Sequence, residues 1–387
     1  MRERIEALPG MPALLAALDG LPPVYLVGGA VRDLLRGADV VDIDLAVEGN
    51  AVDAARTIAE RLGGDPVAHG RFGTATVRSP ELTMDLATTR RERYERPGVL
   101  PEVEYAPLAE DLGRRDFSVN AIAVGLSGDD LGTLYDPHGG VEDLERGVIR
   151  VLHEKSFLDD PTRILRALRY EARLGARMDK DTEILARATA AAGALSTVSG
   201  ARVRDELLDL LAEPEAPDAL ERMRELRVDR ALHPALSADC RFVASAALAA
   251  GETGADPVLA SLAALVSDSP DELTLWVAEL GLTREPRDRV VGAARRAPEL
   301  ARELADDTPP SVLHDLMEGE PPETLALALG MGAPARPVLR FLSDVRGAHL
   351  EVTGDDLLAA GVPRSPAIGR ALAETLRRKL DGEVAGR

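Results

Sequence analysis

Two aspartates, Asp42 and Asp44, stand two positions apart in the apolar run of residues 40–47, which predicts a buried β-strand. Side chains two apart on a strand point to the same face, so the two carboxylates are expected side by side. Such a pair repels strongly unless a cation lies between its members. Oxygen ligands around a hard cation are typical of a magnesium site, so we interpret Asp42 and Asp44 as catalytic ligands of Mg²⁺. The alternative is two solvated aspartates at the end of a strand.

A glycine pair, Gly28-Gly29, lies between an apolar run at 24–27 and a helical pattern at 30–36. Glycine lets the backbone turn sharply and approach a ligand closely, because no Cβ is in the way. Free backbone N–H groups and the positive end of the helix dipole favour a phosphate at such a helix start. Arg32, one turn into the helix, would add a forked positive charge. A phosphate-binding turn beside a metal-binding strand indicates nucleotidyl transfer, whereas a plain glycine turn is the alternative.

A polar segment at 110–121 contains Arg115, Asp116 and Asn120. The forked guanidinium of Arg115 can clamp triphosphate or ribose oxygens through two hydrogen bonds. Asp116 and Asn120, on one helical face or at one strand end, would hold that arginine and the sugar. A surface cluster of ion pairs that caps a helix is the alternative.

A second arginine-rich segment begins at Asp160-Pro161, where Asp160 is expected to be the N-cap of a helix and Pro161 its first residue. The apolar stripe of this helix is expected to be buried, and its opposite face carries Arg163, Arg166, Arg169 and Arg173. Cytosine and adenine both present an exocyclic amine beside an unprotonated ring nitrogen, whereas uracil and guanine present the reverse. Asp160 would accept from the amine and Arg163 would donate to the ring nitrogen, which selects C and A without a template. A capped surface helix with solvated arginines is the alternative.

These segments resemble the class II tRNA nucleotidyltransferases (CCA-adding enzymes) and the bacterial poly(A) polymerases, which belong to the polymerase-β-like nucleotidyltransferases. Residues 26–33 with 42–44 are similar to the opening motif of the family, 110–121 to its second motif, and 159–163 to its nucleotide-selecting motif. The resemblance implies an α+β fold, in which a polymerase-β-like head with a small mixed sheet precedes an all-α neck, body and tail. The expected parts are a head at 1–150, a neck at 151–212, a body at 213–290 and a tail at 291–387.

The resemblance also assigns roles to further residues. Asp85 lies in the second strand of a hairpin expected at 74–77 and 82–87. It would complete the catalytic acidic group, whereas a water-facing aspartate on an edge strand is the alternative. Arg166 and Arg169 match further nucleotide-contacting arginines of the family. The family usually has Glu before the selecting Asp, and this chain has the shorter Asp159 there.

Residues 88–108 are polar, rich in arginine and interrupted by proline, with no period of 2 or 3.6, so they predict a long mobile loop beside the site. The family has a flexible loop at this place that is associated with addition of the terminal adenosine, and enzymes that add only cytidines tend to lack it. The resemblance therefore implies addition of CMP and AMP, from CTP and ATP, to the 3′ end of tRNA. The C-terminal helices would bind the acceptor end and the elbow of the tRNA.

Composition is consistent with a largely helical protein of several domains. A length of 387 residues predicts two to four compact units, and an aromatic content of 3% favours helix packing over β-sandwiches. The single cysteine, Cys240, excludes a disulfide framework and a thiolate zinc site and fits a reducing cytoplasm, where we expect the protein. No apolar run approaches membrane-spanning length, and the N-terminus shows no signal-peptide pattern. The sequence does not determine the oligomeric state.

The net charge of −20 opposes binding to nucleic acid, which normally needs clustered positive charge. Arginine is nevertheless locally dense at 90–96, 114–115 and 163–173. An acidic protein with arginines gathered on one face can still hold RNA, and strong salt sensitivity of binding is the expected consequence.

Other functions fit parts of the pattern. An A-adding enzyme or a poly(A) polymerase shares every motif, although we expect a long basic C-terminal extension in the latter. A non-catalytic RNA-binding protein would keep the helices but tolerate a broken metal pair, and both Asp42 and Asp44 are present. A kinase-like phosphate binder would need Gly-Lys-Ser/Thr after the glycines, and Ala30-Val31 follow instead.

Overall fold

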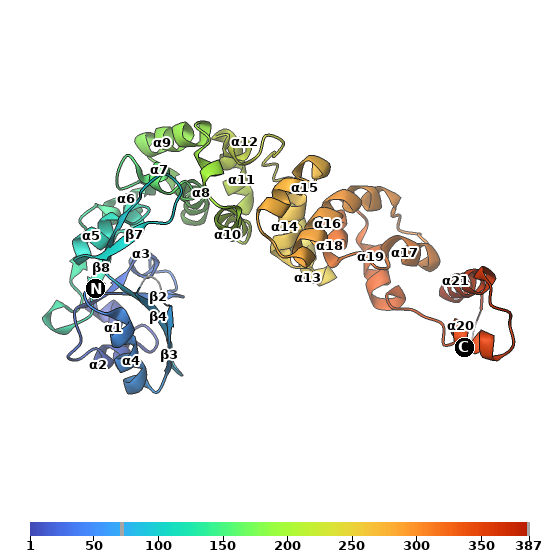
Figure 1. Cartoon of the computed structure of the whole chain (residues 1–387), viewed down its shortest axis with the longest axis horizontal. Coiled ribbons are helices and arrows are strands. Elements are labelled where there is room, and N and C mark those ends of the chain that lie inside the picture. The colour runs from blue at the N-terminus through green and yellow to red at the C-terminus, as the bar shows by residue number, and fades with distance from the viewer. Residues whose placement is uncertain (70–72, 385–387) are drawn as a thin grey trace. The chain divides into compact units, whose positions relative to one another are not determined.

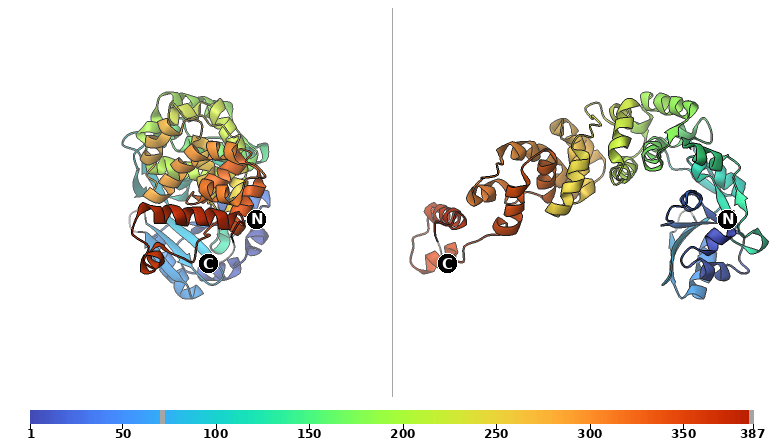
Figure 2. Two further views of the ribbon diagram at one scale, coloured as in Figure 1. Left: turned by 90° about the vertical axis from the view of Figure 1, so that its right-hand side faces the viewer. Right: turned by 180° about the vertical axis from the view of Figure 1, so that it is seen from behind.

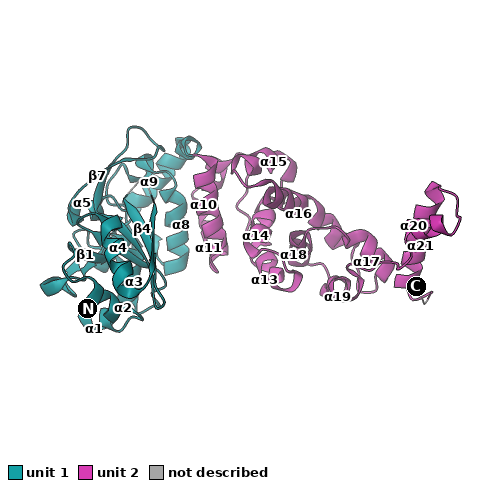
Figure 3. Cartoon of the chain, turned by 60° about the horizontal axis from the view of Figure 1, so that its bottom comes forward, with its two compact units in different colours: residues 1–198 teal, residues 199–387 magenta. Residues whose placement is uncertain are grey.

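The chain forms two compact units, residues 1–198 and 199–387, in a computed structural model that describes residues 1–69 and 73–384 (Figure 3). The first unit contains the predicted head and most of the predicted neck. The finer division into neck, body and tail stays a prediction. Within the described residues, no helix combines the length and the apolar character needed to span a bilayer.

A mixed sheet of seven strands organises the first unit, in the order β3-β4-β5-β2-β1-β8-β9. Its strands β2, β3 and β4 are labelled in Figure 1. β2 and β5 run parallel, and the other neighbours pair antiparallel. The small mixed sheet expected for the head is therefore confirmed. The strands are β1 Val24–Val27, β2 Ile43–Val47, β3 Asp65–His69, β4 Thr74–Arg78, β5 Thr83–Thr88, β8 Ala123–Gly125 and β9 Leu134–Tyr135. Two small sheets pair β6 Arg90–Arg93 with β7 Glu102–Tyr105, and β10 Val148–Ile149 with β11 Arg177–Met178.

The two faces of the large sheet are covered differently. Inward side chains such as Leu26, Leu45 and Leu86 share one apolar core with residues of the first four helices. These helices are α1 Arg2–Glu6, α2 Met11–Ala17, α3 Gly29–Arg36 and α4 Ala51–Leu62, and they appear in blue against the sheet in Figures 1 and 2. On the other face, α5 Leu108–Gly113 covers only the part around Val27 and Ala46. Among the described residues, the rest of this open face borders a cavity.

Local capping explains where α4 begins and ends, and its apolar face explains its packing against the sheet. The Asn50 side chain accepts hydrogen bonds from the backbone N–H groups of Val52 (3.0 Å) and Asp53 (3.2 Å), which satisfies two donors of the first turn. The helix ends at Gly63, whose φ of +65° is the left-handed conformation that glycine adopts at low cost. Ile58 and Ala55 on its inner face are fully buried. The predicted helix at 51–62 is thus confirmed.

The remaining helices of the first unit follow the sheet in sequence. They are α6 Gly140–Arg146, α7 Ser156–Asp159, α8 Arg163–Leu174 and α9 Lys180–Ala191, with the 3₁₀ turns η1 Ser118–Asn120, η2 Gly128–Asp130 and η3 Ala194–Thr197. In α8 the residues Ile164, Leu165 and Leu168 are fully buried, as the apolar stripe predicted. The helix begins later than expected, at Arg163 with Thr162 as its N-cap.

The second unit is entirely helical within its described residues, as predicted. Its centre is α14 Pro257–Val266, in which every residue from Leu259 onward is buried. Glu323 of α18 is fully buried and accepts a hydrogen bond from Asp256 N (3.0 Å) and the guanidinium of Arg289 (2.8 Å from Nε). The other elements are α10 Gly200–Leu211, α11 Ala216–Glu225, α12 Val228–Leu232, α13 Val243–Thr253, α15 Pro270–Glu279, α16 Arg284–Glu303, α17 Pro310–Met317, α18 Pro322–Gly330, α19 Ala335–Arg340, η4 Phe341–Val345, α20 Gly354–Ala359 and α21 Pro366–Leu380.

The strand predicted at 40–47 is shorter in the structure. β2 begins at Ile43, which pairs with Met84, and the neighbouring strand β5 begins only one residue earlier, at Thr83. Residues 40–42 lie outside the sheet, and Val41 is 82% exposed. Asp42 therefore lies just before the strand and not on it.

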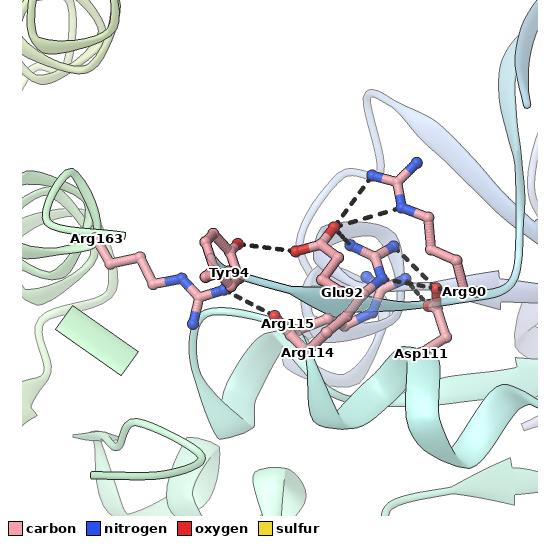
Figure 4. A network of polar contacts seen from close by, with 7 residues as sticks. All are labelled: Arg90, Glu92, Tyr94, Asp111, Arg114, Arg115 and Arg163. Atoms are coloured by element: carbon pink, nitrogen blue, oxygen red, sulfur yellow. Dashed lines mark hydrogen bonds and ion pairs between the residues drawn. The ribbon is translucent and has the colours of Figure 1, made fainter. Parts of the chain in front are cut away.

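The prediction that residues 88–108 form one long loop without regular structure is wrong, and the predicted mobility of this segment stays a prediction. This segment contains the antiparallel hairpin β6–β7, with Arg91 opposite Glu104 and Arg93 opposite Glu102. The exposure of β6 alternates along the strand, but its inner side chains are Arg90 and Glu92. An ion pair between Glu92 and Arg114 and a hydrogen bond from the Arg90 backbone N–H to Asp111 take the place of apolar contacts on this inner face (Figure 4), so the hydrophobic period on which the prediction relied is missing.

Candidate active site

The glycine turn between β1 and α3 has the strained geometry that its sequence predicted. Gly28 has a φ of +67°, which side-chain-bearing residues rarely adopt, and its N–H donates to the Ile122 carbonyl (3.1 Å). A Cβ at this position would lie 2.8 Å from a terminal guanidinium nitrogen of Arg115. The missing side chain thus makes the space that Arg115 occupies.

Replacing Gly28 with alanine should therefore lower both stability and nucleotide affinity. The positive φ costs about 1–3 kcal/mol of unfolding free energy, and the new Cβ forces Arg115 to move. We expect the dissociation constant for ATP or CTP, measured by calorimetric titration, to rise about 10-fold or more. Gly63→Ala is the matched control, because Gly63 has nearly the same φ, +65°, with no atom within 4 Å of the added Cβ. An equal loss of affinity in both variants would contradict this role of Gly28.

The acidic residues gather on the open face of the sheet. Asp44 of β2 and Asp85 of β5 are register partners on parallel neighbouring strands, so their side chains share one face. Burial raises the pKa of the half-buried Asp44, the charges of Asp85 and Asp42 act in the same direction, and Arg115 opposes them. Asp42, although outside the strand, is thus close enough to act on Asp44. The structure brings the three predicted acidic residues into one region.

The chemistry of this donor set suits a hard cation, which would offset the burial and the repulsion that raise the pKa of Asp44. Within residues 1–69 and 73–384, however, no three His, Cys, Asp or Glu side chains are arranged closely enough to hold a metal ion. Asp85 is engaged elsewhere, because its Oδ1 accepts a hydrogen bond from the Thr76 hydroxyl (2.5 Å). The donor types therefore suit a hard cation, and a metal held by Asp42 and Asp44 stays a prediction.

A cavity of about 440 Å³ lies over Asp44 and Asp85, and Asp42 does not line it. Its polar lining comes from five segments and includes Asp44, His69, Thr76, Asp85, Arg114 and Arg115. Carboxylates at one side and guanidinium groups at the other can hold a metal–phosphate group, since each charge of such a group then meets its opposite.

Arg115 is held in this cavity by Asp111 and not by Asp116 as predicted. Arg115 donates to Oδ2 of Asp111 (3.1 Å), and Arg114 donates to Oδ1 of the same carboxylate (2.9 Å). Burial alone would raise the pKa of Asp111, but the two arginines hold it below its usual value. The Nε of Arg115 is buried, and it has no hydrogen-bond partner in the part of the chain that the structure describes. A bound ligand could supply that partner.

Arg32 does not project toward a phosphate as the sequence suggested. Its side chain is only 3% exposed and donates to both carboxylate oxygens of Asp33 (2.9 and 2.8 Å) and to Oδ1 of Asn120 (2.8 Å). One guanidinium nitrogen lies 3.6 Å from the Cβ position of Gly29. Arg32 therefore packs against the glycine turn and stabilises it. Helical periodicity locates an arginine on a face but does not reveal the partner that the face meets.

Asp116 connects the predicted head to helix α8. Its Oδ2 accepts from Nε and a terminal nitrogen of Arg166 (2.9 and 2.8 Å), and its Oδ1 accepts from Asn120 Nδ2 (3.0 Å). Burial would raise the pKa of Asp116, but the Arg166 charge and the hydrogen bonds lower it to about 2. The partner that the sequence assigned to Asp116, Arg115, was therefore wrong, whereas the clustering of Asp116 with Asn120 is confirmed.

Tyr170 of α8 is a member of this cluster that sequence reasoning missed. Its ring has three guanidinium carbons within 5.3–5.6 Å of its centroid, those of Arg32, Arg166 and Arg169, and its hydroxyl accepts from Arg166 (3.1 Å). The ring packs edge-on against Phe117. An aromatic residue one turn after Arg166 was a visible signal for such a contact.

The predicted base-reading pair is engaged within the protein. Asp160 Oδ1 accepts from the backbone N–H (3.1 Å) and the hydroxyl (2.7 Å) of Thr162, so it caps the turn before α8. Arg163 was expected on the exposed face but is 6% exposed, and it donates to the Ser156 hydroxyl (2.7 Å) and the Arg114 carbonyl (2.8 Å). These bonds use two of the five N–H donors of Arg163. The two side chains are thus fixed beside the second motif.

Two family models match the chain. The Poly A polymerase head domain matches residues 24–150, and the probable RNA and SrmB-binding site of polymerase A matches residues 177–240. The first match spans the sheet, the acidic residues and the second motif. The second match extends over α9, α10 and α11.

Named relatives are similar over most of the chain. The A-adding tRNA nucleotidyltransferase of Geobacter sulfurreducens is 37% identical over 94% of this chain and 44% of its own length. The CC-adding tRNA nucleotidyltransferase of Deinococcus radiodurans is 33% identical over 93% of this chain and 85% of its own length. The structure of the Thermotoga maritima CCA-adding enzyme complexed with tRNA(CCA) is 31% identical, with a TM-score of 0.74 over 97% of this chain and 92% of that one. The chain spans half or less of the length of the A-adding relatives it matches.

Proposed function

Because the chain belongs to the tRNA nucleotidyltransferase family, we propose that it adds CMP and AMP, from CTP and ATP, to the 3′ end of tRNA without a template. The single observation that carries this proposal is the cavity on the open face of the sheet. There Asp44 and Asp85 lie in register on parallel strands, opposite an arginine that occupies the space left by Gly28. Acids for a metal and an arginine for phosphates thus meet at one glycine turn.

Mg²⁺ is the proposed cofactor, with Asp42 and Asp44 as the residues that would hold it. When bound, the ion would supply positive charge to activate the tRNA 3′-hydroxyl and to stabilise the leaving pyrophosphate. Asp85 would complete the acidic group while its hydrogen bond from Thr76 fixes its orientation. The half-buried position of Asp44 supports the proposal, because a cation there would offset the burial and the neighbouring negative charges that disfavour its ionised form.

The nucleotide would be bound by groups on three elements. Gly28, Gly29 and Arg115 would bind the triphosphate and ribose, and Asp160 with Arg163 would read the base. Four further predicted residues would act by holding these groups in place, and they are Arg32, Asp116, Asn120 and Arg166. Arg169, half-buried over the Tyr170 ring, would contact the nucleotide or the primer from the same helix.

The tRNA acceptor end and elbow are the proposed partner surfaces of the helical part of the chain. The match of residues 177–240 to an RNA-binding model supports this, as does the tRNA-bound state of the Thermotoga maritima relative. The activity is expected in the cytoplasm, where tRNA is processed and where the single Cys240 would stay reduced.

The proposal is tested by a primer-by-nucleotide assay. Transcripts of one tRNA that end before CCA, after the first C and after the second C are each incubated with CTP or ATP alone, and the products are resolved at single-nucleotide length. We expect CMP incorporation on the first two transcripts and AMP incorporation on the third. Failure to extend any transcript with either nucleotide would refute the proposed function.

An enzyme that adds only the terminal AMP is the second candidate. The observation that favours it is the greater identity to the A-adding relative, 37%, than to the CC-adding one, 33%. In the same assay this enzyme would extend only the transcript that ends in CC, and only with ATP. A poly(A) polymerase would instead add a run of AMP to every transcript.

A further inference from the structure

A row of polar side chains crosses four neighbouring strands on the open face of the large sheet. Thr76 of β4 is the register partner of Asp85 on β5, and Asp85 is the register partner of Asp44 on β2. His69 of β3 is the register partner of Thr74, which precedes Thr76 by two positions. Register partners, and residues two apart on a strand, share one face of a sheet. All five residues therefore lie on one face, and they line the cavity of about 440 Å³.

Two hydrogen bonds join three of these side chains. The Thr76 hydroxyl oxygen lies 2.5 Å from Oδ1 of Asp85 and 3.0 Å from Nε2 of His69. The hydroxyl has one hydrogen, and the ionised carboxylate of Asp85 can only accept, so Thr76 donates to Asp85. Thr76 must then accept from His69, which assigns a hydrogen to Nε2 of the His69 ring. The hydrogen-bond chain therefore runs from His69 through Thr76 to Asp85.

The orientation of the Asp85 carboxylate depends on this chain, because Asp85 is exposed at the cavity and core packing does not hold it. Thr76 is suited to hold it, since its β-branched side chain has a restricted χ1 on a strand that pairs directly with β5. Donation from His69 polarises the Thr76 hydroxyl and strengthens its bond to Asp85. Oδ1 of Asp85 is thus fixed, and Oδ2 can accept a hydrogen from a substrate.

The charges around Asp85 show what the chain prevents. Burial raises the pKa of Asp44, Arg115 lowers it, and the charge of Asp85 raises it. Without its hydrogen bond from Thr76, the Asp85 carboxylate would turn away from Asp44 and towards the guanidinium groups at the other side of the cavity. It would compete there with phosphate for Arg115. The hydrogen bond keeps Asp85 on the side of the acids.

We propose that His69 is a positioning residue for nucleotidyl transfer, which acts through Thr76 on Asp85. The proposal rests on the proposed function, since Asp85 would use Oδ2 to accept the hydrogen of the attacking tRNA 3′-hydroxyl. His69 acts without touching either substrate. Once tRNA and nucleotide fill the cavity and exclude water, both hydrogen bonds become stronger than in the open cavity.

A double-mutant cycle of His69→Leu and Thr76→Val tests this role by steady-state kinetics on the tRNA transcript that the wild type extends. Leucine removes the donor, and valine keeps the branched shape of Thr76 without its hydroxyl. We expect kcat to fall about 3- to 10-fold in His69→Leu and about 10-fold or more in Thr76→Val, which loses a hydrogen bond to a charged group. The KM for the nucleotide should stay unchanged, because Arg115 and the glycine turn are intact. His69→Leu should have no further effect in the Thr76→Val background.

Two further variants serve as controls. In His69→Gln the side-chain amide can donate in place of Nε2, so this variant should recover most of the kcat lost in His69→Leu. Thr83→Val makes the same change as Thr76→Val on the neighbouring strand β5, at an exposed position opposite Arg78 on the face of Asp85. This variant should keep the wild-type kcat, since the described lining of the cavity does not include Thr83.

Wild-type kcat in His69→Leu, a loss that His69→Gln does not recover, or an equal loss in Thr83→Val would overturn the proposal. An additional loss in the double variant as large as that of His69→Leu alone would also overturn it, because His69 would then act independently of Thr76. If Thr76→Val does not fold, the comparison of His69→Leu with His69→Gln decides in the same way. A wild-type protein that incorporates no nucleotide would instead refute the proposed function, and with it this role of His69.

Discussion

Replacing Asp44 with asparagine should lower nucleotide incorporation by about 10³-fold or more while the protein stays folded. A metal ligand at the reacting phosphate supplies several kcal/mol of transition-state stabilisation, which corresponds to a rate factor of that size. The asparagine side chain keeps the volume of the aspartate but not the charge that would hold Mg²⁺. The measurement is single-nucleotide incorporation on the tRNA transcript that the wild-type enzyme extends.

The same substitution should keep or raise the free energy of unfolding, although it lowers activity. Burial and two neighbouring acids raise the pKa of Asp44 above its ordinary value of 3.8, so the folded protein binds this proton more tightly than the unfolded chain does. The stability that Asp44 contributes is therefore lost as the pH rises through its folded pKa. Without divalent cations at neutral pH, urea denaturation should show Asp44→Asn at least as stable as the wild type.

Asp53→Asn is the matched control for both measurements. Asp53 lies on α4, and its side chain is 64% exposed in an ion pair with Arg56. We expect wild-type activity and a change in unfolding free energy within about 0.5 kcal/mol. Wild-type activity in Asp44→Asn would contradict the metal role of Asp44, and a large loss of stability would contradict the electrostatic account of this residue.

Replacing Asp116 with asparagine should destabilise the first unit by about 3 kcal/mol, because the partly buried guanidinium of Arg166 then loses its carboxylate. The pKa of Asp116 is lowered to about 2, so its contribution is present above 3.8 and is lost as the pH falls from 3.8 towards about 2. The difference in unfolding free energy between wild type and variant should therefore narrow over that range. Chemical denaturation of both proteins at a series of pH values measures this difference in unfolding free energy.

A double variant separates the ion pair from other roles of Asp116. Removing both charges in Asp116→Asn with Arg166→Met should restore part of the stability, since replacing a whole buried pair costs less than breaking it. Activity should stay low in both variants, because Asn120 and Arg32 lose the support of Asp116. Strictly additive stability losses of the two substitutions would show that the pair is not coupled.

Local signals in the sequence were sufficient for the glycine turn and for Asp44. Gly28 needs a positive φ, a local property that glycine pairs indicate, and Asp44 alternates with Ile43 and Leu45 in an apolar run. The pairing of Asp44 with Asp85 could not be read from the sequence, because it depends on which strands become neighbours in the sheet. The family resemblance supplied it instead.

The errors at Arg32, Arg163 and β6 share one physical cause, since charged side chains were expected at the surface and found their partners in distant segments. Arg32 meets Asn120, 88 positions away, and Arg163 meets the carbonyl of Arg114, 49 positions away. The inner face of β6 is closed by Glu92 with Arg114 and not by apolar residues. Hydrophobic periodicity contains no information about such pairs.

The most direct test of the central claim is the binding of Mn²⁺, as a paramagnetic substitute for Mg²⁺, in the presence of a non-hydrolysable ATP or CTP analogue. Electron paramagnetic resonance of free Mn²⁺ is measured for the wild type, for Asp42→Ala with Asp44→Ala, and for Asp53→Asn. We predict that the wild type and Asp53→Asn bind Mn²⁺ with the analogue, whereas the double variant binds it at least ~10-fold more weakly. Equal Mn²⁺ binding by all three proteins would contradict the claim that these two aspartates hold the metal beside the glycine turn.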